Sequence, residues 1–126
     1  MGEPNSLVAR AREVAQRAYA PYSHFRVGAA LQDSDGAIFV GCNVENASYS
    51  LTICAERSAV FGAVSAGAQR PFTALAVTCL DGACAPCGAC RQVIAEHFSD
   101  DAAILVDGLG QFTPGELLPH GFRLNA

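Results

Sequence analysis

The sequence of 126 residues has the length of one domain and is long enough to bury a hydrophobic core without disulfides. Hydrophobic residues make up 51% of the chain and charged residues only 16%, so we expect further copies to cover part of its apolar surface, as in a homo-oligomer. The formal net charge of -4 and the lack of any run of Lys or Arg argue against a nucleic acid partner.

Two further features bear on the compartment. The start of the chain lacks the basic and apolar segments of a signal peptide, and no apolar run approaches the roughly 18 residues of a membrane span. Four of the six cysteines stand in short, motif-like surroundings, which in a reducing compartment indicates metal binding or catalysis rather than a disulfide framework. We therefore expect a cytoplasmic protein with no membrane partner.

The first part of the chain predicts a helix followed by a hairpin. Apolar residues recur at intervals of three and four over residues 6–20, which predicts an amphipathic helix that is stopped by Pro21. Residues 25–32 and 37–42 are rich in Val, Phe, Ile and Leu, and the turn formers between them end in Gly36. This pattern predicts a β-hairpin.

Helices and strands alternate in the next part of the chain. Residues 53–66 have helical spacing and are followed by Gly67, which suits the end of a helix. Residues 72–80 form a short β-rich run that predicts a buried strand. Pro86 then precedes a third predicted helix over residues 87–98.

The last part of the chain completes the predicted fold. Residues 102–106 predict a further strand, and residues 113–118 a short segment that becomes helical after Pro114. Helices and strands that alternate after an opening hairpin predict an α/β fold, with a single mixed sheet and helices on both faces. We expect one domain over residues 1–126.

A group of cysteines and a carboxylate predicts a catalytic metal site. Cys87 and Cys90 are three residues apart at the start of a predicted helix, where free backbone N–H groups and the helix dipole favour thiolates. Cys54 also begins a predicted helix, and as a third ligand it would leave one tetrahedral position of Zn²⁺ open for water. Glu56 can act as general base and acid. Arg57 and the helix N-termini would compensate the negative charge of three thiolates.

Other interpretations of the cysteines stay open at this stage. A Cys-x-x-Cys pair alone also suits a structural zinc site or a redox pair. Cys84 extends the pair to the spacing of part of an iron–sulfur motif, and it could also close a four-cysteine zinc site without catalysis. Because Cys84 precedes Pro86, we interpret it as a thiol that is not a ligand. We interpret Cys42 and Cys79 as core residues, and the three histidines as structural.

Six segments along the chain form a combined pattern. They are Pro21-Tyr22-Ser23-His24-Phe25, Val27-Gly28-Ala29-Ala30-Leu31, Gly41-Cys42-Asn43-Val44-Glu45-Asn46-Ala47, Cys54-Ala55-Glu56-Arg57, Pro86-Cys87-Gly88-Ala89-Cys90-Arg91-Gln92 and Leu117-Leu118-Pro119. In these segments the sequence resembles the small homotetrameric cytidine deaminases. The resemblance implies a three-layer α/β/α fold with about five strands, one of which we expect near residues 111–122.

The resemblance also implies a reaction and the residues that carry it. One zinc ion per subunit would be held by Cys54, Cys87 and Cys90. Glu56 would shuttle protons while a zinc-bound hydroxide attacks C4 of the pyrimidine. Cytidine and deoxycytidine would become uridine and deoxyuridine with release of ammonia, a reaction of pyrimidine nucleoside salvage. The substrate-binding positions it implies are Phe25, Asn43, Glu45, Ala47, Tyr49, Ala55 and Phe122.

These positions would have different tasks. Asn43 and Glu45 would hydrogen-bond the ribose, chiefly its 3′-hydroxyl, and Phe25 would line the pocket of the base. Ala47, Tyr49 and Phe122 match positions that complete the pocket of a neighbouring subunit in the homotetramer. Deaminases of the antibiotic nucleoside blasticidin S share the cysteine segments, but the sequence Asn-Val-Glu-Asn-Ala at residues 43–47 argues against that substrate.

Overall fold

The computed structural model describes residues 4–124, so the first three and last two residues of the predicted domain lie outside the described part. In chain order the elements are α1 (Pro4–Ala15), β1 (Val27–Gln32), β2 (Ile38–Cys42), the 3₁₀ helix η1 (Tyr49–Leu51), α2 (Ala55–Ser65), β3 (Phe72–Cys79), α3 (Gly88–His97), β4 (Phe98–Val106), β5 (Gly110–Phe112) and α4 (Pro114–Leu117). None of the helices in this part of the chain is long and apolar enough to cross a membrane.

The five strands form one mixed sheet in the order β2-β1-β3-β4-β5. β1 is antiparallel to both β2 and β3, β3 is parallel to β4, and β4 is antiparallel to β5. The parallel pair is joined through α3, as a parallel connection requires a crossover. The predicted hairpin and the predicted mixed sheet are therefore confirmed.

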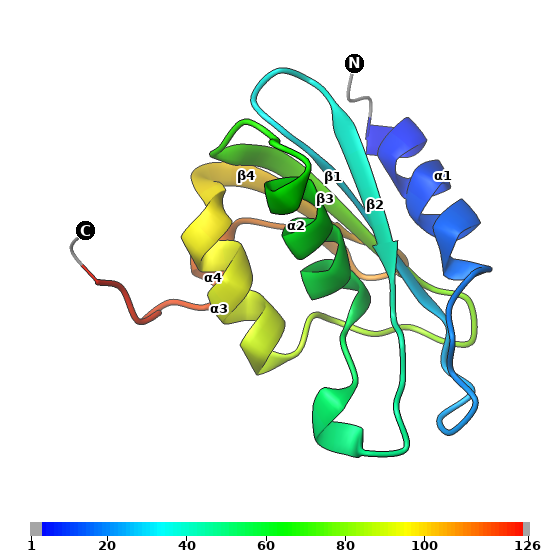
Figure 1. The fold of residues 1–126 in the computed structure, drawn as a ribbon. Helices are drawn as coiled ribbons and strands as arrows, with labels where there is room; N and C mark the ends of the chain where they lie inside the picture. The colour runs from blue at the N-terminus through cyan, green and yellow to red at the C-terminus, as the bar shows by residue number, and fades with distance from the viewer. Residues whose placement is uncertain (1–3, 125–126) are drawn as a thin grey trace.

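Helices cover both faces of this sheet (Figure 1). On one face, Val60 of α2, Ile94 of α3 and Leu117 of α4 pack with strand residues in the larger buried cluster. On the other face, Leu7 and Ala11 of α1 pack in a smaller cluster against the inner strands. This confirms the expected three layers.

Several predicted boundaries are wrong. The first helix ends at Ala15 rather than at residue 20, because Tyr19 leaves the helix to pair with residues 43–45: its N–H donates to the Asn43 carbonyl at 3.0 Å, and its carbonyl accepts from Glu45 at 2.8 Å. The fourth strand begins at Phe98, four residues earlier than predicted.

The start of β4 is irregular, because its pairing with β3 shifts register between the first two residue pairs. The exposed residues Asp100 and Asp101 lie in this irregular stretch. The third helix begins at Gly88, one residue later than predicted, and Cys87 is its N-cap residue. The strand expected near residues 111–122 is β5, which is short and begins at Gly110.

Candidate active site

Two helix starts meet at the predicted metal site. Cys54 is the N-cap residue of α2, Cys87 is the N-cap residue of α3, and Cys90 lies in the first turn of α3. The Sγ atoms of Cys54 and Cys87 are 3.9 Å apart, and those of Cys87 and Cys90 are 3.4 Å apart. The ligand atoms of all three cysteines lie within 4.8 Å of one another.

This donor set fits zinc. A tetrahedral ion with Zn–S bonds of about 2.3 Å holds its sulfur ligands roughly 3.8 Å apart, which is close to both observed separations. Three thiols supply three of the four ligands of a tetrahedral ion, so the fourth position stays open to water or substrate. This is the pattern of catalytic rather than structural zinc sites. The N-termini of α2 and α3 meet at this place, and helix N-termini carry unpaired N–H groups and favour negative charge.

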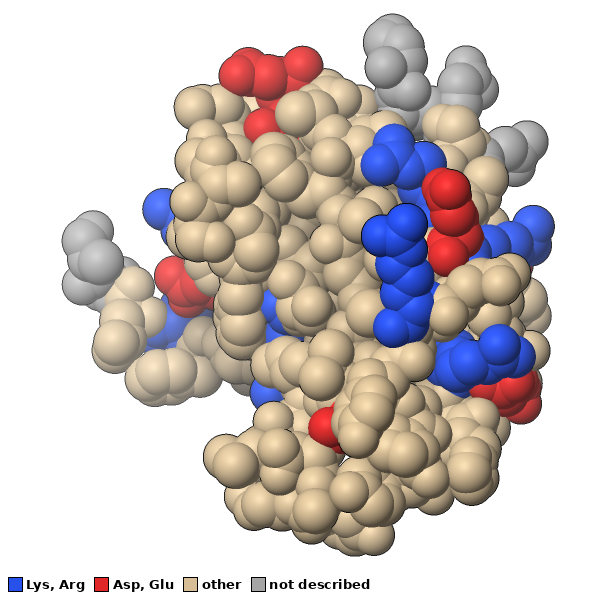
Figure 2. Space-filling view, turned by 45° about the vertical axis from the view of Figure 1, so that its right-hand side comes forward, with Lys and Arg blue, Asp and Glu red and all other residues tan. Residues whose placement is uncertain are grey.

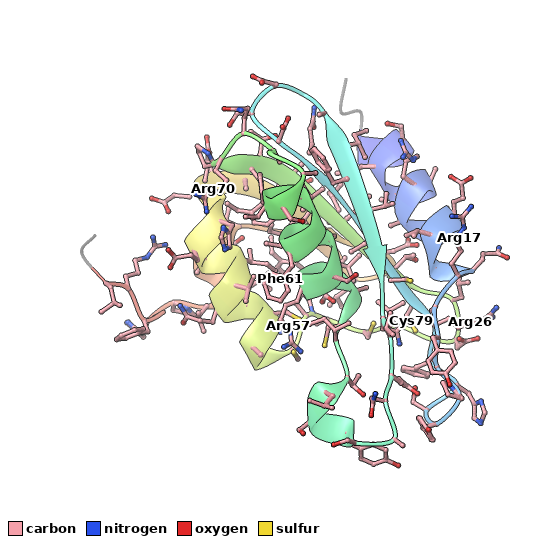
Figure 3. The ribbon with its side chains drawn as sticks, in the orientation of Figure 1. Arg17, Arg26, Arg57, Phe61, Arg70 and Cys79 are labelled. Carbon is pink, nitrogen blue, oxygen red and sulfur yellow. The ribbon has the colours of Figure 1, made fainter. Side chains whose placement is uncertain are left out.

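Arg57 places a cation beside Cys54. Its Nη2 donates to the Sγ of Cys54 at 3.2 Å, and Figure 3 shows its side chain beside the sulfur atoms at the start of the helices. A hydrogen bond with Cys90 and the neighbouring Arg57 guanidinium lower the pKa of Cys54 to about 5. The Nε of Arg57 is buried and has no hydrogen-bond partner in the part of the chain that the structure describes. This position suits the predicted role in charge compensation.

Glu56 is a buried carboxylic acid in the first turn of α2, with only 5% of its surface exposed. Burial raises the pKa of its carboxyl group. A carboxyl group that keeps its proton closer to neutral pH is suited to give as well as to take a proton.

Two neighbouring hollows make up the candidate substrate site. The first, of about 180 Å³, is the one into which the metal site opens. It is lined by Phe25, Val27, Asn43, Thr52, Ile53, Cys54, Ala55, Glu56, Cys84, Ala85 and Cys87. The second, of about 330 Å³, is lined by Tyr22, Ser23, Glu45, Tyr49 and Thr52. Thr52 lines both, so the two hollows are neighbours.

Asn43 connects the first hollow to the backbone around it. Its side chain is buried, Oδ1 accepts from the Val27 N–H at 2.8 Å, and Nδ2 donates to the Phe25 carbonyl at 2.7 Å. Asn43 thus fixes the entry of β1, where Phe25 stands at the rim of the hollow. Spacing in the sequence gives no sign of this bridge.

Glu45 is held by the loop before β1. Its Oε1 accepts from the N–H groups of Tyr22 at 2.9 Å and Ser23 at 3.2 Å, and its Oε2 accepts from the Ser23 hydroxyl. The Ser23 hydrogen bond is the main cause that lowers the pKa of Glu45, which keeps the group a carboxylate.

Three predicted site residues lie outside the hollow at the predicted metal site. Ala47 is exposed in the loop before η1. Tyr49 lines the second hollow and is 75% exposed. Phe122 is 67% exposed on the C-terminal segment, where the side-chain amide of Gln92 binds both its N–H and its carbonyl, at 3.1 and 2.7 Å. Within one chain these three residues do not reach the first hollow.

Sequence reasoning missed several lining residues, namely Val27, Thr52, Ile53 and Ala85, and it gave Cys84 no place in the site. Cys84 lies on the wall of the first hollow but outside the group of thiols at ligand distance, among the described residues. Burial and the neighbouring Cys79 raise its pKa to about 12. Among the described residues, Cys84 therefore does not complete a four-cysteine zinc site. Cys42 and Cys79, predicted as core residues, are only half-buried at strand ends.

Comparison with known proteins places this geometry in context. The family model for the cytidine and deoxycytidylate deaminase zinc-binding region matches residues 1–105. The cytidine deaminase of Sporosarcina psychrophila is 48% identical over 121 residues, which cover 92% of this chain and 88% of the relative.

Solved structures agree with this match. The crystal structure of cytidine deaminase from Burkholderia pseudomallei has 47% identity and a TM-score of 0.87, and covers 96% of this chain and 100% of that chain. The structure of cytidine deaminase from Mycobacterium tuberculosis has 42% identity and a TM-score of 0.89, and covers 98% and 100%.

Proposed function

Because the chain belongs to the family of zinc-dependent cytidine and deoxycytidylate deaminases, we propose that it hydrolyses cytidine and deoxycytidine to uridine and deoxyuridine, with release of ammonia. The observation that carries this proposal is the hollow lined by Cys54, Cys87 and the buried carboxyl group of Glu56, with Cys90 at ligand distance from the two thiols. The starts of α2 and α3 bring these groups together, although Cys54 and Cys87 are 33 positions apart in the sequence.

The chain supplies the ligands and the proton carrier for this reaction. Cys54, Cys87 and Cys90 would hold one zinc ion per subunit, which when bound supplies the Lewis acid that makes water a nucleophile at neutral pH. Glu56 takes a proton from the attacking water and delivers it to the amine that leaves C4. Its burial favours this exchange, because the raised pKa makes the protonated form a stable partner in the cycle. Arg57 offsets the negative charge of the thiolates.

The rest of the hollow would hold the nucleoside. Phe25, which is 43% exposed at the rim, and Ala55 would contact the base. Asn43 and Glu45 would bind the sugar, and a carboxylate that accepts from a 3′-hydroxyl does not need a 2′-hydroxyl. We therefore propose that both ribo- and deoxyribonucleosides react, in pyrimidine salvage. The reduced thiols that such a zinc site requires support a cytoplasmic location.

We propose further that the active protein is a homotetramer. Large apolar side chains stand exposed on η1, α2 and the C-terminal segment, among them Leu51 at 68%, Phe61 at 49% and Phe122 at 67%. Figure 2 shows that the lower part of the molecule, which holds η1, has almost no charged side chain on the face drawn. Neighbouring copies that cover this surface would bring Ala47, Tyr49 and Phe122 to one another's pockets.

The decisive experiment measures turnover and metal on the same sample. Purified protein is mixed with cytidine, the fall of the cytidine absorbance band is followed, and the metal content is determined. We expect turnover with about one zinc per chain, since three thiols at tetrahedral spacing form one site. Bound zinc without turnover of cytidine or deoxycytidine would overturn the proposed substrate, and protein containing iron with acid-labile sulfide would overturn the proposed metal.

A further inference from the structure

The loop before β1 concentrates its hydrogen bonds on one carboxylate. Three donors converge on Glu45, and two of them belong to Ser23, through its backbone N–H and its hydroxyl. Ser23 is thus the residue with most contacts to Glu45, although its own surface is exposed. Both side chains line the second hollow, together with Tyr22, Tyr49 and Thr52.

The direction of the Ser23 hydroxyl is fixed by a second bond. The Phe25 N–H donates to the Ser23 Oγ at 3.0 Å, so the hydroxyl accepts on one side. A serine hydroxyl has one proton to donate, and here it goes to Oε2 of Glu45. Ser23 therefore connects the proposed sugar ligand, Glu45, to the backbone of the proposed base contact, Phe25.

The backbone of the loop is shaped for this arrangement. His24 has a φ of 62°, in the left-handed region that residues other than glycine rarely adopt, and its N–H donates to the Ala20 carbonyl at 3.0 Å. Such outliers persist where the surroundings determine the conformation. The turn closes the loop and presents the Ser23 hydroxyl to Glu45 on one side and to Phe25 on the other.

Counting acceptor positions shows what is left for a ligand. A carboxylate has about four lone-pair positions, two on each oxygen. The two backbone N–H groups occupy Oε1, and Ser23 occupies one position of Oε2. Of the contacts that the structure shows, one acceptor position remains, and it is on the oxygen that Ser23 orients.

We propose that Ser23 is a positioning residue that determines sugar specificity: it holds Oε2 of Glu45 so that the remaining acceptor position receives the 3′-hydroxyl of the substrate. The inference rests on the proposed function and adds a residue to it. Ser23 acts indirectly, by orienting Glu45, and does not itself contact the reacting atoms. A carboxylate without this bond would rotate and receive the same hydroxyl less well.

The test pairs a variant with a change in the substrate. Values of kcat/KM are measured for Ser23→Ala with 2′-deoxycytidine and with 2′,3′-dideoxycytidine, which lacks the 3′-hydroxyl. We expect a loss of about tenfold for deoxycytidine, carried by KM, since a hydrogen bond to a charged group is removed. The loss for dideoxycytidine should be at most about twofold, and Ser23→Thr, which keeps the hydroxyl, should restore most of the discrimination.

Controls separate the possible failures. Ser34→Ala removes another exposed loop hydroxyl, one that donates to the Pro71 carbonyl, and should leave both values unchanged. Glu45→Gln should remove the preference for deoxycytidine. If Glu45→Gln affects both substrates equally, the proposed sugar contact fails; if it is selective while Ser23→Ala affects both substrates equally, the positioning role of Ser23 is refuted. Ser23→Cys, a weaker donor, replaces Ser23→Ala if the latter does not fold, and the same comparison decides.

Discussion

Four consecutive residues, Cys54-Ala55-Glu56-Arg57, bring three different chemical groups to one helix start. Cys54 caps α2, and Arg57, three positions later, returns to it because residues three apart share a helix face. Glu56 points instead into the buried side, where it is shielded from water. The proposed metal ligand, compensating cation and proton carrier thus lie within a single helical turn and point in different directions from it.

The carboxyl group of Glu56 should be indispensable for turnover. In Glu56→Gln the side chain keeps its size but cannot exchange protons, so kcat should fall at least about 100-fold. The three cysteines are untouched, and zinc content should therefore stay near one per chain. Glu96→Gln, at an exposed position of α3, is the control and should retain normal activity. A Glu56→Gln enzyme with near-normal kcat would contradict the proton-carrier role.

At the residue scale the sequence predicts some contacts and not others, for a physical reason. Cys54, Cys87 and Cys90 could be placed because helix starts and a three-residue spacing are local features. The support of Glu45 by Ser23 could not, because it depends on the left-handed backbone of His24, which no local pattern announces. The sequence equally hides the bridge from Asn43 to Phe25 and Val27, which joins parts of the chain 16 and 18 positions apart.

At the scale of elements, α2 lies unusually close to the sheet at Gly41 of β2. A Cβ atom at this position would be 2.4 Å from the backbone nitrogen of Ala59, a distance at which one of the two elements has to move. Gly28 of β1 plays the same part for α1, with a Cβ position 2.0 Å from the Ala11 carbonyl oxygen. Since α2 carries Cys54 and Glu56, the glycine in β2 also sets the position of the active site.

Gly41→Ala should therefore damage both stability and catalysis. We expect the added methyl group to destabilise the fold by about 1–3 kcal/mol, as overpacking does, and to lower kcat/KM because α2 shifts. Gly62→Ala is the matched control within α2: apart from the neighbouring backbone of the helix itself, no atom of the described chain lies within 4 Å of its Cβ position, and replacing a helical glycine should add roughly 0.5–1 kcal/mol of stability. Thermal unfolding and steady-state kinetics measure both effects. Equal behaviour of the two variants would contradict the close-packing explanation.

Element types followed from the sequence more reliably than element ends. The helical period of residues 53–66 and the Gly67 cap are local, and the structure confirms them with α2 and a φ of 87° at Gly67. The early end of α1 could not be predicted, because it depends on backbone pairing of Tyr19 with a segment 24 to 26 positions along, at Asn43 and Glu45. Tertiary pairing there outweighs helical spacing.

At the scale of the whole molecule, one proposed substrate-binding residue, Phe122, is exposed on the surface of the described chain. Phe122 is 67% exposed, and yet two hydrogen bonds from Gln92 hold its backbone in place. Gln92 lies on α3, the helix that starts at the metal site. With its backbone held and its surface mostly uncovered within the described chain, Phe122 has the arrangement expected if its ring enters the pocket of another copy.

Mixed assemblies can test this exchange directly. Glu56→Gln subunits lack the proton carrier but keep Phe122, whereas Phe122→Ala subunits keep Glu56 but lack the ring. If each pocket takes Phe122 from a neighbour, coexpression of the two impaired variants at equal levels should restore roughly a quarter of the sites, by random assembly of a symmetric oligomer. Glu56→Gln mixed with Cys87→Ala is the control and should restore nothing, since both changes affect the site within one chain. Mixed Glu56→Gln and Phe122→Ala assemblies no more active than their parents, with Phe122→Ala itself impaired, would show that the ring acts within its own chain.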